Sequence, residues 1–137
     1  MKNFIFIFLF TPLISFASFP IKLDFPSSDT IIKNGKIYTP PIETGALGGI
    51  TRKTVIEIAN NLGLETEETN INADQLKDAD ELFFTGTATE VVGVVSVDGE
   101  DITDGKPGEI TGNIRQKYLE IVNGENEDFL HYLTLVK

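Results

Sequence analysis

The chain has 137 residues, which is enough for one domain with a buried core and too few to expect two. Its formal net charge of -10 argues against a nucleic-acid partner, because phosphate backbones bind faces rich in Lys and Arg. The absence of cysteine excludes a disulfide framework, a thiolate nucleophile and a Cys-ligated zinc site. The single histidine, His131, cannot build a multi-His metal site, so we expect no metal.

The first twenty residues have the outline of a secretory signal. They combine Lys2, an apolar run interrupted by Pro12, and small residues ending at Ala17. The run is too short and too interrupted to predict a membrane span. Seven of the ten phenylalanines lie within residues 4–25, so the composition changes abruptly where the soluble pattern begins. Two interpretations of residues 1–29 stay open: an export signal, or an unrelated segment from a miscalled start or a shifted reading frame.

From Thr30 the pattern becomes regular. The stretch TIIKNGKIYTPP predicts a β-hairpin, because Asn34-Gly35 tolerates the positive φ angles of a tight turn. A glycine-rich loop follows, and then a helix over residues 51–63. Thr51 suits its N-cap and Gly63 its C-terminal stop. Its apolar residues recur with helical spacing: Val55, Ile58, Ala59 and Leu62.

The second half of the chain mixes short strands with helices. A strand is expected over residues 64–71, followed by a short helix that Asn72 caps, with Gln75 at the reciprocal position. Strands ELFF and EVVGVVSV come next, and Asp98-Gly99 predicts a second hairpin. A last helix runs from near Glu109 to Gly124, with one apolar face: Ile110, Ile114, Tyr118, Ile121 and Val122. The order of elements indicates a mixed α/β or α+β fold.

The stretch ALGGITRKT, residues 46–54, is a candidate anion site. A glycine-rich approach to a helix leaves backbone N–H groups free, and the helix dipole adds partial positive charge there. Arg52 and Lys53 oppose that dipole, a conflict that a bound anion would relieve. The alternative is an ordinary capped helix behind a flexible loop.

A second candidate is FFTGTATEVV, residues 83–92, where small residues interrupt two strand-like runs. We expect a kink between strands. Gly86 permits a bend, and the small residues Thr87, Ala88 and Thr89 let another group approach the backbone amides. The alternative is a structural bulge that joins two strands without binding anything.

Five blocks together carry a family resemblance: IIKNGKIYTPP, ALGGITRKTVIEIA, DADELFFTGTATEV, VDGEDITDGKPGEIT and FLHYLTLV. In this order and spacing they resemble the C-terminal part of branched-chain amino acid aminotransferases, which are fold-type IV pyridoxal phosphate enzymes. The resemblance implies that residues 30–137 are a portion of the large C-terminal domain of that fold, with mixed α+β structure. It also implies pyridoxal 5'-phosphate as cofactor, with branched-chain amino acids and 2-oxo acids as substrates.

The resemblance assigns site residues one by one. The GIT turn, Gly49, Ile50 and Thr51, would grip the cofactor phosphate, while Leu47 would contact the pyridine ring. Thr87 matches a further phosphate contact. The amides of Thr87 and Ala88 match contacts to the substrate carboxylate, with Gly86 allowing the approach.

No catalytic residue carries over. In the family the lysine that forms the Schiff base lies upstream of the matched region, and so does a glutamate that faces the pyridine nitrogen. Lys2 and Lys22 lie in the unrelated segment. Transamination needs that lysine for covalent attachment and for proton transfer, so the chain alone is expected to be a fragment of the enzyme. The family implies a cytoplasmic homo-oligomer with no membrane contact.

Other functions stay open beside this one. Within the fold, D-amino acid aminotransferase and aminodeoxychorismate lyase are the alternatives. The alternative from a different class of function is a secreted, non-catalytic module that binds small anions through its two turns. It would be exported if residues 1–17 are a true signal peptide.

Overall fold

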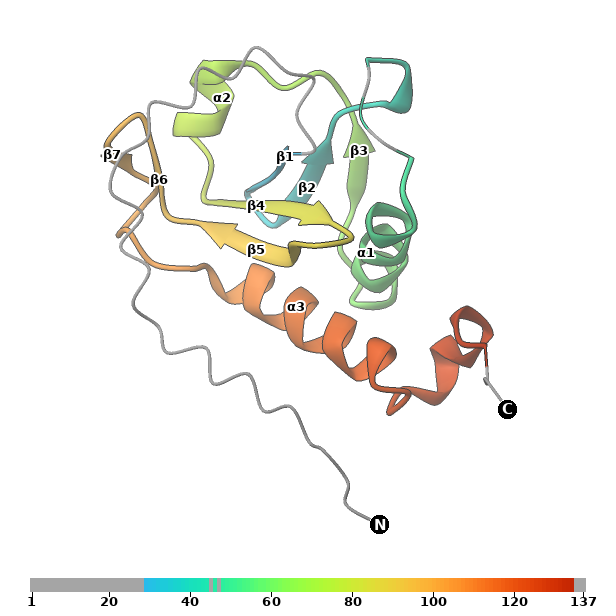
Figure 1. Cartoon of the computed structure of the whole chain (residues 1–137). Coiled ribbons are helices and arrows are strands. Elements are labelled where there is room, and N and C mark those ends of the chain that lie inside the picture. Colours follow the sequence, from blue (N-terminus) through green and yellow to red (C-terminus); the bar gives the residue numbers. More distant parts are fainter. Residues whose placement is uncertain (1–28, 45, 47, 135–137) are drawn as a thin grey trace.

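The computed structural model describes residues 29–44, 46 and 48–134. The signal-like residues 1–28 and the ring contact expected at Leu47 lie outside this part of the chain. A five-stranded sheet in the order β3-β2-β1-β4-β5 forms the centre (Figure 1). Its strands are β1 (Asp29–Lys33), β2 (Lys36–Thr39), β3 (Thr66–Glu68), β4 (Glu81–Gly86) and β5 (Glu90–Val94).

Both expected hairpins are confirmed. Asn34 and Gly35 have φ angles of 51° and 74° and join β1 to β2 in antiparallel register. Asp98 and Gly99, at 53° and 81°, join β6 (Ser96–Val97) to β7 (Glu100–Asp101) in a separate two-stranded sheet. The run EVVGVVSV is therefore two strands, β5 and β6, because the chain leaves the main sheet after Val94.

The remaining strand pairings are non-local. β4 lies antiparallel to β1, with Ile31 opposite Leu82, and antiparallel to β5. β3 pairs with β2 in parallel, with Ile37 opposite Thr66, because α1 carries the chain back to the same end of the sheet. The strand expected over residues 64–71 is shorter than its pattern, since only three residues pair.

The helices are α1 (Ile50–Asn61), α2 (Ala73–Lys77) and α3 (Glu109–Val122), with two 3₁₀ turns, η1 (Ile42–Thr44) and η2 (Glu127–Tyr132). The glycine stops after α1 and α3 are confirmed: Gly63 and Gly124 both have φ of 74°. The reciprocal capping by Asn72 and Gln75 is also confirmed. The N-cap expected at Thr51 is wrong, because α1 begins at Ile50 behind Gly49 and the side chain of Thr51 is buried.

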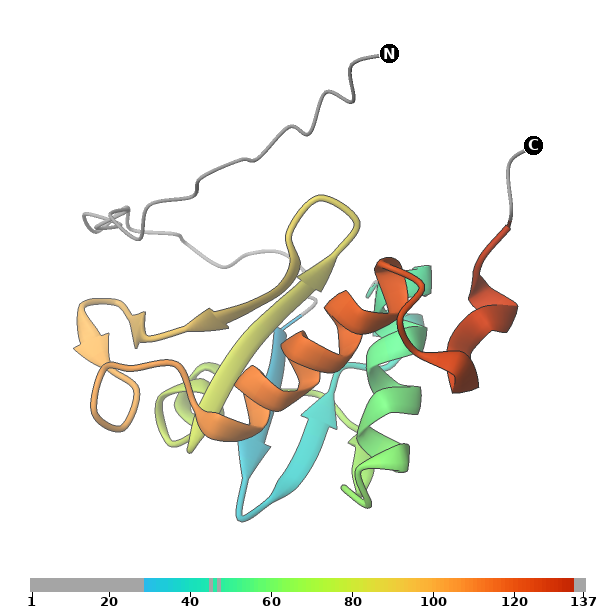
Figure 2. The same ribbon diagram turned by 90° about the horizontal axis from the view of Figure 1, so that it is seen from below.

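The main core lies between one face of the sheet and the helices α1 and α3, which pack side by side against it (Figure 2). Phe83 of β4 is completely buried at its centre, and burial of such a side chain stabilises the fold by roughly 1.5–3 kcal/mol. The opposite face carries a smaller cluster under α2, formed by Ile31, Leu76, Ala79 and Leu82. Val122, expected on the buried face of α3, is 50% exposed.

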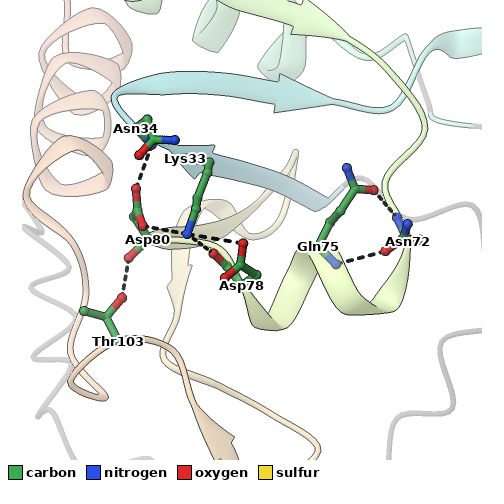
Figure 3. A network of polar contacts seen from close by, with 7 residues as sticks. All are labelled: Lys33, Asn34, Asn72, Gln75, Asp78, Asp80 and Thr103. Carbon is green, nitrogen blue, oxygen red and sulfur yellow. Dashed lines mark hydrogen bonds and ion pairs between the residues drawn. The ribbon is translucent and has the colours of Figure 1, made fainter.

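A polar network ties three loops together at one end of the sheet, where β1 ends and β4 begins (Figure 3). The Asp80 carboxylate accepts a hydrogen bond from the backbone N–H of Asn34 at 2.7 Å and lies 3.2 Å from the Lys33 Nζ. The hydroxyl of Thr103 donates to the Asp80 carbonyl oxygen at 2.8 Å. These contacts hold the first hairpin, the start of β4 and the loop after β7 in one arrangement. Within the described part of the chain, none of the helices has the length and apolar character needed to cross a membrane.

Candidate functional site

The first turn of α1 presents free backbone amides. Its N-cap is Gly49, in an extended conformation with φ -67° and ψ 160°, and no side chain caps it. The first intrahelical bond runs from the Lys53 N–H to the Gly49 carbonyl at 3.2 Å. The N–H groups of Ile50, Thr51 and Arg52 therefore have no acceptor within the helix. The first turn contains no acidic residue, so the positive end of the dipole is not neutralised there.

The N-terminus of α3 differs in this respect. It also follows a glycine, Gly108, and has no capping side chain of its own. The Glu81 carboxylate from β4 takes that role, accepting from the N–H groups of Ile110 and Thr111 at 3.0 and 2.7 Å. A carboxylate thus satisfies two amides of α3, whereas among the described residues no side chain caps the first turn of α1.

The loop before α1 holds its first turn at the surface. The backbone at Gly48 lies against Ile42, so closely that a Cβ at Gly48 would be 3.1 Å from the Ile42 Cδ1. Gly49 and Ile50 are exposed, with 63% of Ile50 open to solvent, whereas Thr51 is buried at 3%. Of the three residues expected to grip a phosphate, Gly49 and Ile50 therefore lie at accessible positions, and Thr51 is anchored in the core.

Arg52 behaves differently from the sequence expectation. Its guanidinium Nη2 donates to the Pro40 carbonyl and to the Glu68 carboxylate, both at 3.0 Å. This ion pair with β3 places a negative partner beside the cation, so no bound anion is needed to relieve a conflict at Arg52. The prediction failed because Glu68 is brought there by the β2–β3 pairing, which the local pattern of the helix does not contain.

The second candidate is a tight hairpin turn, and the kink expected between two strands is wrong. Thr87–Thr89 reverse the chain between β4 and β5, and Gly86 pairs with Glu90 across the turn. Glu90, the first residue of β5, takes a positive φ of 56° directly after the turn. Thr87 and Ala88 are exposed. A Cβ at Gly86 would lie 2.8 Å from the Thr89 Oγ1, so the space beside Gly86 is filled from within the turn.

The two turns lie at the same end of the sheet. Arg52, in the first turn of α1, and Thr85, one residue before Gly86, line one small cavity. The two stretches that the sequence identified separately thus each have a residue at, or directly before, their turn that lines this cavity, although Thr87–Thr89 do not line it. The described residues contain no group of three or more His, Asp or Glu side chains able to hold a metal ion. His131 lies in η2, 3.8 Å from Glu57 of α1.

Comparisons with known proteins identify relatives of the chain. The family model described as "Amino-transferase class IV" matches residues 28–97. A branched-chain-amino-acid aminotransferase of Pseudomonas aeruginosa is 43% identical over 107 residues, which are 78% of this chain and 34% of the relative. A D-alanine aminotransferase of Bacillus licheniformis is 42% identical over 85 residues, 62% of this chain and 30% of the relative.

Solved structures show the same similarity in three dimensions. The branched-chain amino acid aminotransferase of Escherichia coli matches with a TM-score of 0.76 and 38% identity. The match covers 80% of this chain and 36% of that structure. The chain thus has the fold-type IV architecture expected from the sequence, and it spans about a third of the length of the curated relatives it matches.

Proposed function

This chain belongs to the class IV aminotransferase family, and from that premise we propose that it supplies part of the cofactor and substrate site of a branched-chain amino acid aminotransferase. The complete reaction would move an amino group between leucine, isoleucine or valine and 2-oxoglutarate. Pyridoxal 5'-phosphate, when bound, acts as the electron sink for this chemistry. The observation that carries the proposal is the uncapped first turn of α1 at Gly49-Ile50-Thr51.

The residues present fit a phosphate group. Free N–H groups at a helix N-terminus bind anions, and the dipole adds about 0.3–1 kcal/mol for a negative group near the surface. The first turn of α1 offers these donors and contains no acidic side chain that would compete for them. Ile50, at the start of this turn, is exposed to solvent. We assign the phosphate to the turn of Gly49, Ile50 and Thr51, and the ring contact to Leu47 on the resemblance alone.

The turn at Thr87–Thr89 is assigned to the substrate side. Its exposed residues Thr87 and Ala88 present backbone N–H groups at the same end of the sheet as the first turn of α1. We propose that these two amides bind the substrate carboxylate and that the Thr87 side chain adds a phosphate contact. Gly86 shapes this turn through its close contact with Thr89.

The chain is assigned binding roles and no catalytic residue. The match spans about a third of the relatives' length. We therefore propose, for the complete enzyme, that it carries out the transamination, forms a homo-oligomer and lies in the cytoplasm. These residues would orient the cofactor and the substrate. Binding of the phosphate would fix the position of the cofactor, and binding of the carboxylate would fix the position of the amino group to be transferred.

The experiment compares pyridoxal 5'-phosphate with pyridoxal, which lacks the phosphate, by equilibrium dialysis against the purified chain. Ile50→Pro removes one N–H from the site, and proline is favoured at the first helical position. The extended backbone of Gly49 also suits the residue before a proline. Ile50→Ala is the matched control, because it removes the side chain and keeps the N–H.

We expect pyridoxal 5'-phosphate to bind and pyridoxal to bind much more weakly. Ile50→Pro should weaken binding of the phosphate compound about tenfold, equal to roughly 1.4 kcal/mol, without lowering stability. Ile50→Ala should leave the affinity within about twofold. Equal binding of the two compounds, or equal effects of the two substitutions, would contradict the phosphate assignment.

A D-amino acid aminotransferase is the second candidate, because the D-alanine aminotransferase of Bacillus licheniformis is 42% identical to this chain. The two candidates differ in the amino acid that the Thr87–Thr89 turn accepts. Added to the chain with saturating pyridoxal 5'-phosphate, L-leucine should raise the melting temperature more than D-alanine does. The opposite order would favour the second candidate.

A further inference from the structure

The core has a polar end. On the face of the sheet that α1 and α3 cover, three apolar residues, Ile32, Ile37 and Phe83, each lie two positions from a threonine on the same strand. These threonines are Thr30, Thr39 and Thr85, all buried, with 3%, 3% and 8% exposed. Residues paired across neighbouring strands and residues two apart share one face, so the three threonines gather at one end of it.

A small cavity lies at this polar end. It is bounded by the three threonines and Arg52, with apolar walls from Ile37, Val55, Ile56 and Ala59. Its volume is about 10 Å³. A buried site of roughly 10–15 Å³ holds a single water molecule when two or more polar partners surround it.

Arg52 has a buried donor without an acceptor among the described residues. The residue is 9% exposed, and its Nη2 contacts Pro40 and Glu68. Its Nε–H, however, is buried without a hydrogen-bond partner among the described residues. A buried donor with no acceptor is destabilising, and ordered water is the usual partner in native proteins when protein atoms do not supply one.

We propose that one internal water molecule occupies this cavity, accepting a hydrogen bond from the Arg52 Nε–H and bonding to the threonine hydroxyls. It links the first turn of α1 to β1, β2 and β4. A phosphate or similar anion is too large for this volume, and the Arg52 charge is already paired with Glu68.

The position of the water gives it a role in the site, a consequence that rests on the proposed function. Arg52 directly follows Thr51, and Thr85 directly precedes Gly86. A water bound between Arg52 and Thr85 sets the spacing of the two turns that would hold phosphate and carboxylate. The water itself is observable without any cofactor, so a failure of cofactor binding and a failure of the water site are separate results.

The first test is a crystal structure of the chain at high resolution, together with the double variant Thr39→Val, Thr85→Val. The wild-type chain should show one density peak within hydrogen-bond distance of the Arg52 Nε and of a threonine hydroxyl, and the double variant should lose it. Thr66→Val is the control, because the Thr66 hydroxyl is also buried and unpartnered but does not line the cavity. An empty wild-type cavity, a peak with the scattering of an ion, or a peak that survives in the double variant would overturn the proposal.

A second test needs no crystals. The sequence contains two arginines, Arg52 and Arg115, so a nitrogen-15 spectrum has two Nε–H signals to assign. A long-lived water should give the Arg52 signal a cross-peak to the water resonance with the sign of a slowly tumbling contact. The exposed Arg115 should show only rapid exchange with solvent. Absence of such a cross-peak at Arg52 would count against the water even if the variants fail to crystallise.

Discussion

The Glu81 carboxylate, in β4, accepts both the backbone N–H and the hydroxyl of Thr111, in the first turn of α3, at 2.7 and 2.6 Å. Its other oxygen accepts from the Ile110 N–H at 3.0 Å. A strand residue thus caps a helix that begins 28 positions later in the chain. The negative group also lies at the positive end of the helix dipole, which strengthens the arrangement.

Glu81→Gln should destabilise the chain by roughly 1–2 kcal/mol, because one carboxylate oxygen becomes an NH₂ donor facing backbone donors. Urea unfolding measures the change. Glu109→Gln is the matched control, since Glu109 is an exposed acid in the same helical turn and is expected to contribute only tenths of a kcal/mol. Equal losses for the two variants would show that Glu81 contributes charge alone and no specific cap.

Gly108→Ala tests the same contact from the helix side. A Cβ at Gly108 would lie 1.9 Å from the Glu81 Cδ, so the carboxylate would have to leave the helix end. We expect a loss similar to that of Glu81→Ala, and little further loss when the two substitutions are combined. Gly112→Ala, one turn later with nothing within 4 Å of its Cβ, should instead stabilise by about 0.5–1 kcal/mol. Additive losses for Gly108→Ala and Glu81→Ala would contradict the coupling.

The turns and the cap by Glu81 differ in whether they could be predicted from the sequence. Asn34-Gly35, Asp98-Gly99, Gly63 and Gly124 were predicted correctly, because positive φ is a local requirement that a residue type reveals. The capping by Glu81 was missed, because the pairing of β4 with β1 and β5 places that side chain, and no local pattern records this pairing.

In the candidate site, too, the local features were predictable from the sequence and the features that depend on distant strands were not. The amides at Gly49, Ile50 and Thr51 follow from a local glycine-rich helix start, although the cap expected at Thr51 was misplaced by two residues. The partner of Arg52 and the threonine cavity depend on strands brought together from distant positions. The sequence signal for the cavity was that the apolar runs of β1, β2 and β4 each have a threonine at one end. These threonines are Thr30, Thr39 and Thr85.

Acid should weaken the network at Asp80. The backbone N–H of Asn34 and then the Lys33 ammonium lower the pKa of Asp80 below its ordinary value of 3.8. A carboxylate whose pKa is lower in the folded state stabilises the fold above the unfolded pKa, and this stabilisation is lost as the pH falls through the folded pKa. Urea unfolding between about pH 6 and pH 2 should therefore show a steeper loss for the wild-type chain than for Asp80→Asn.

Asp78→Asn is the control for this pH dependence. Asp78 also faces Lys33, at 3.4 Å, but its side chain is 81% exposed. Surface ion pairs of this kind contribute little, so Asp78→Asn should keep nearly the wild-type pH dependence. If Asp80→Asn and the wild-type chain lost stability in parallel as the pH fell, the Asn34–Asp80 contact would not be the cause.

Gly86→Ala tests why a glycine precedes the Thr87–Thr89 turn: to make room for the Thr89 side chain, or to let a substrate carboxylate approach. The backbone φ of Gly86 is not in the positive region, so alanine can adopt it, but its Cβ would lie 2.8 Å from the Thr89 Oγ1. Displacing Thr89 should cost about 1 kcal/mol in urea unfolding. In a Thr89→Ala background the obstacle is gone, and Gly86→Ala should become neutral or stabilise by up to about 1 kcal/mol, because it restricts the unfolded chain.

The double variant Gly86→Ala, Thr89→Ala then tests the ligand side of the same turn. If Gly86 serves only the packing within the turn, this stable variant should bind pyridoxal 5'-phosphate as the wild-type chain does, and L-leucine should still raise its melting temperature. If Gly86 is needed for the approach of a substrate carboxylate to the Thr87 and Ala88 amides, the L-leucine effect should disappear while the cofactor still binds. We expect the second result, because the methyl group is added to the residue that directly precedes, in the sequence, the two residues whose amides we assign to the carboxylate.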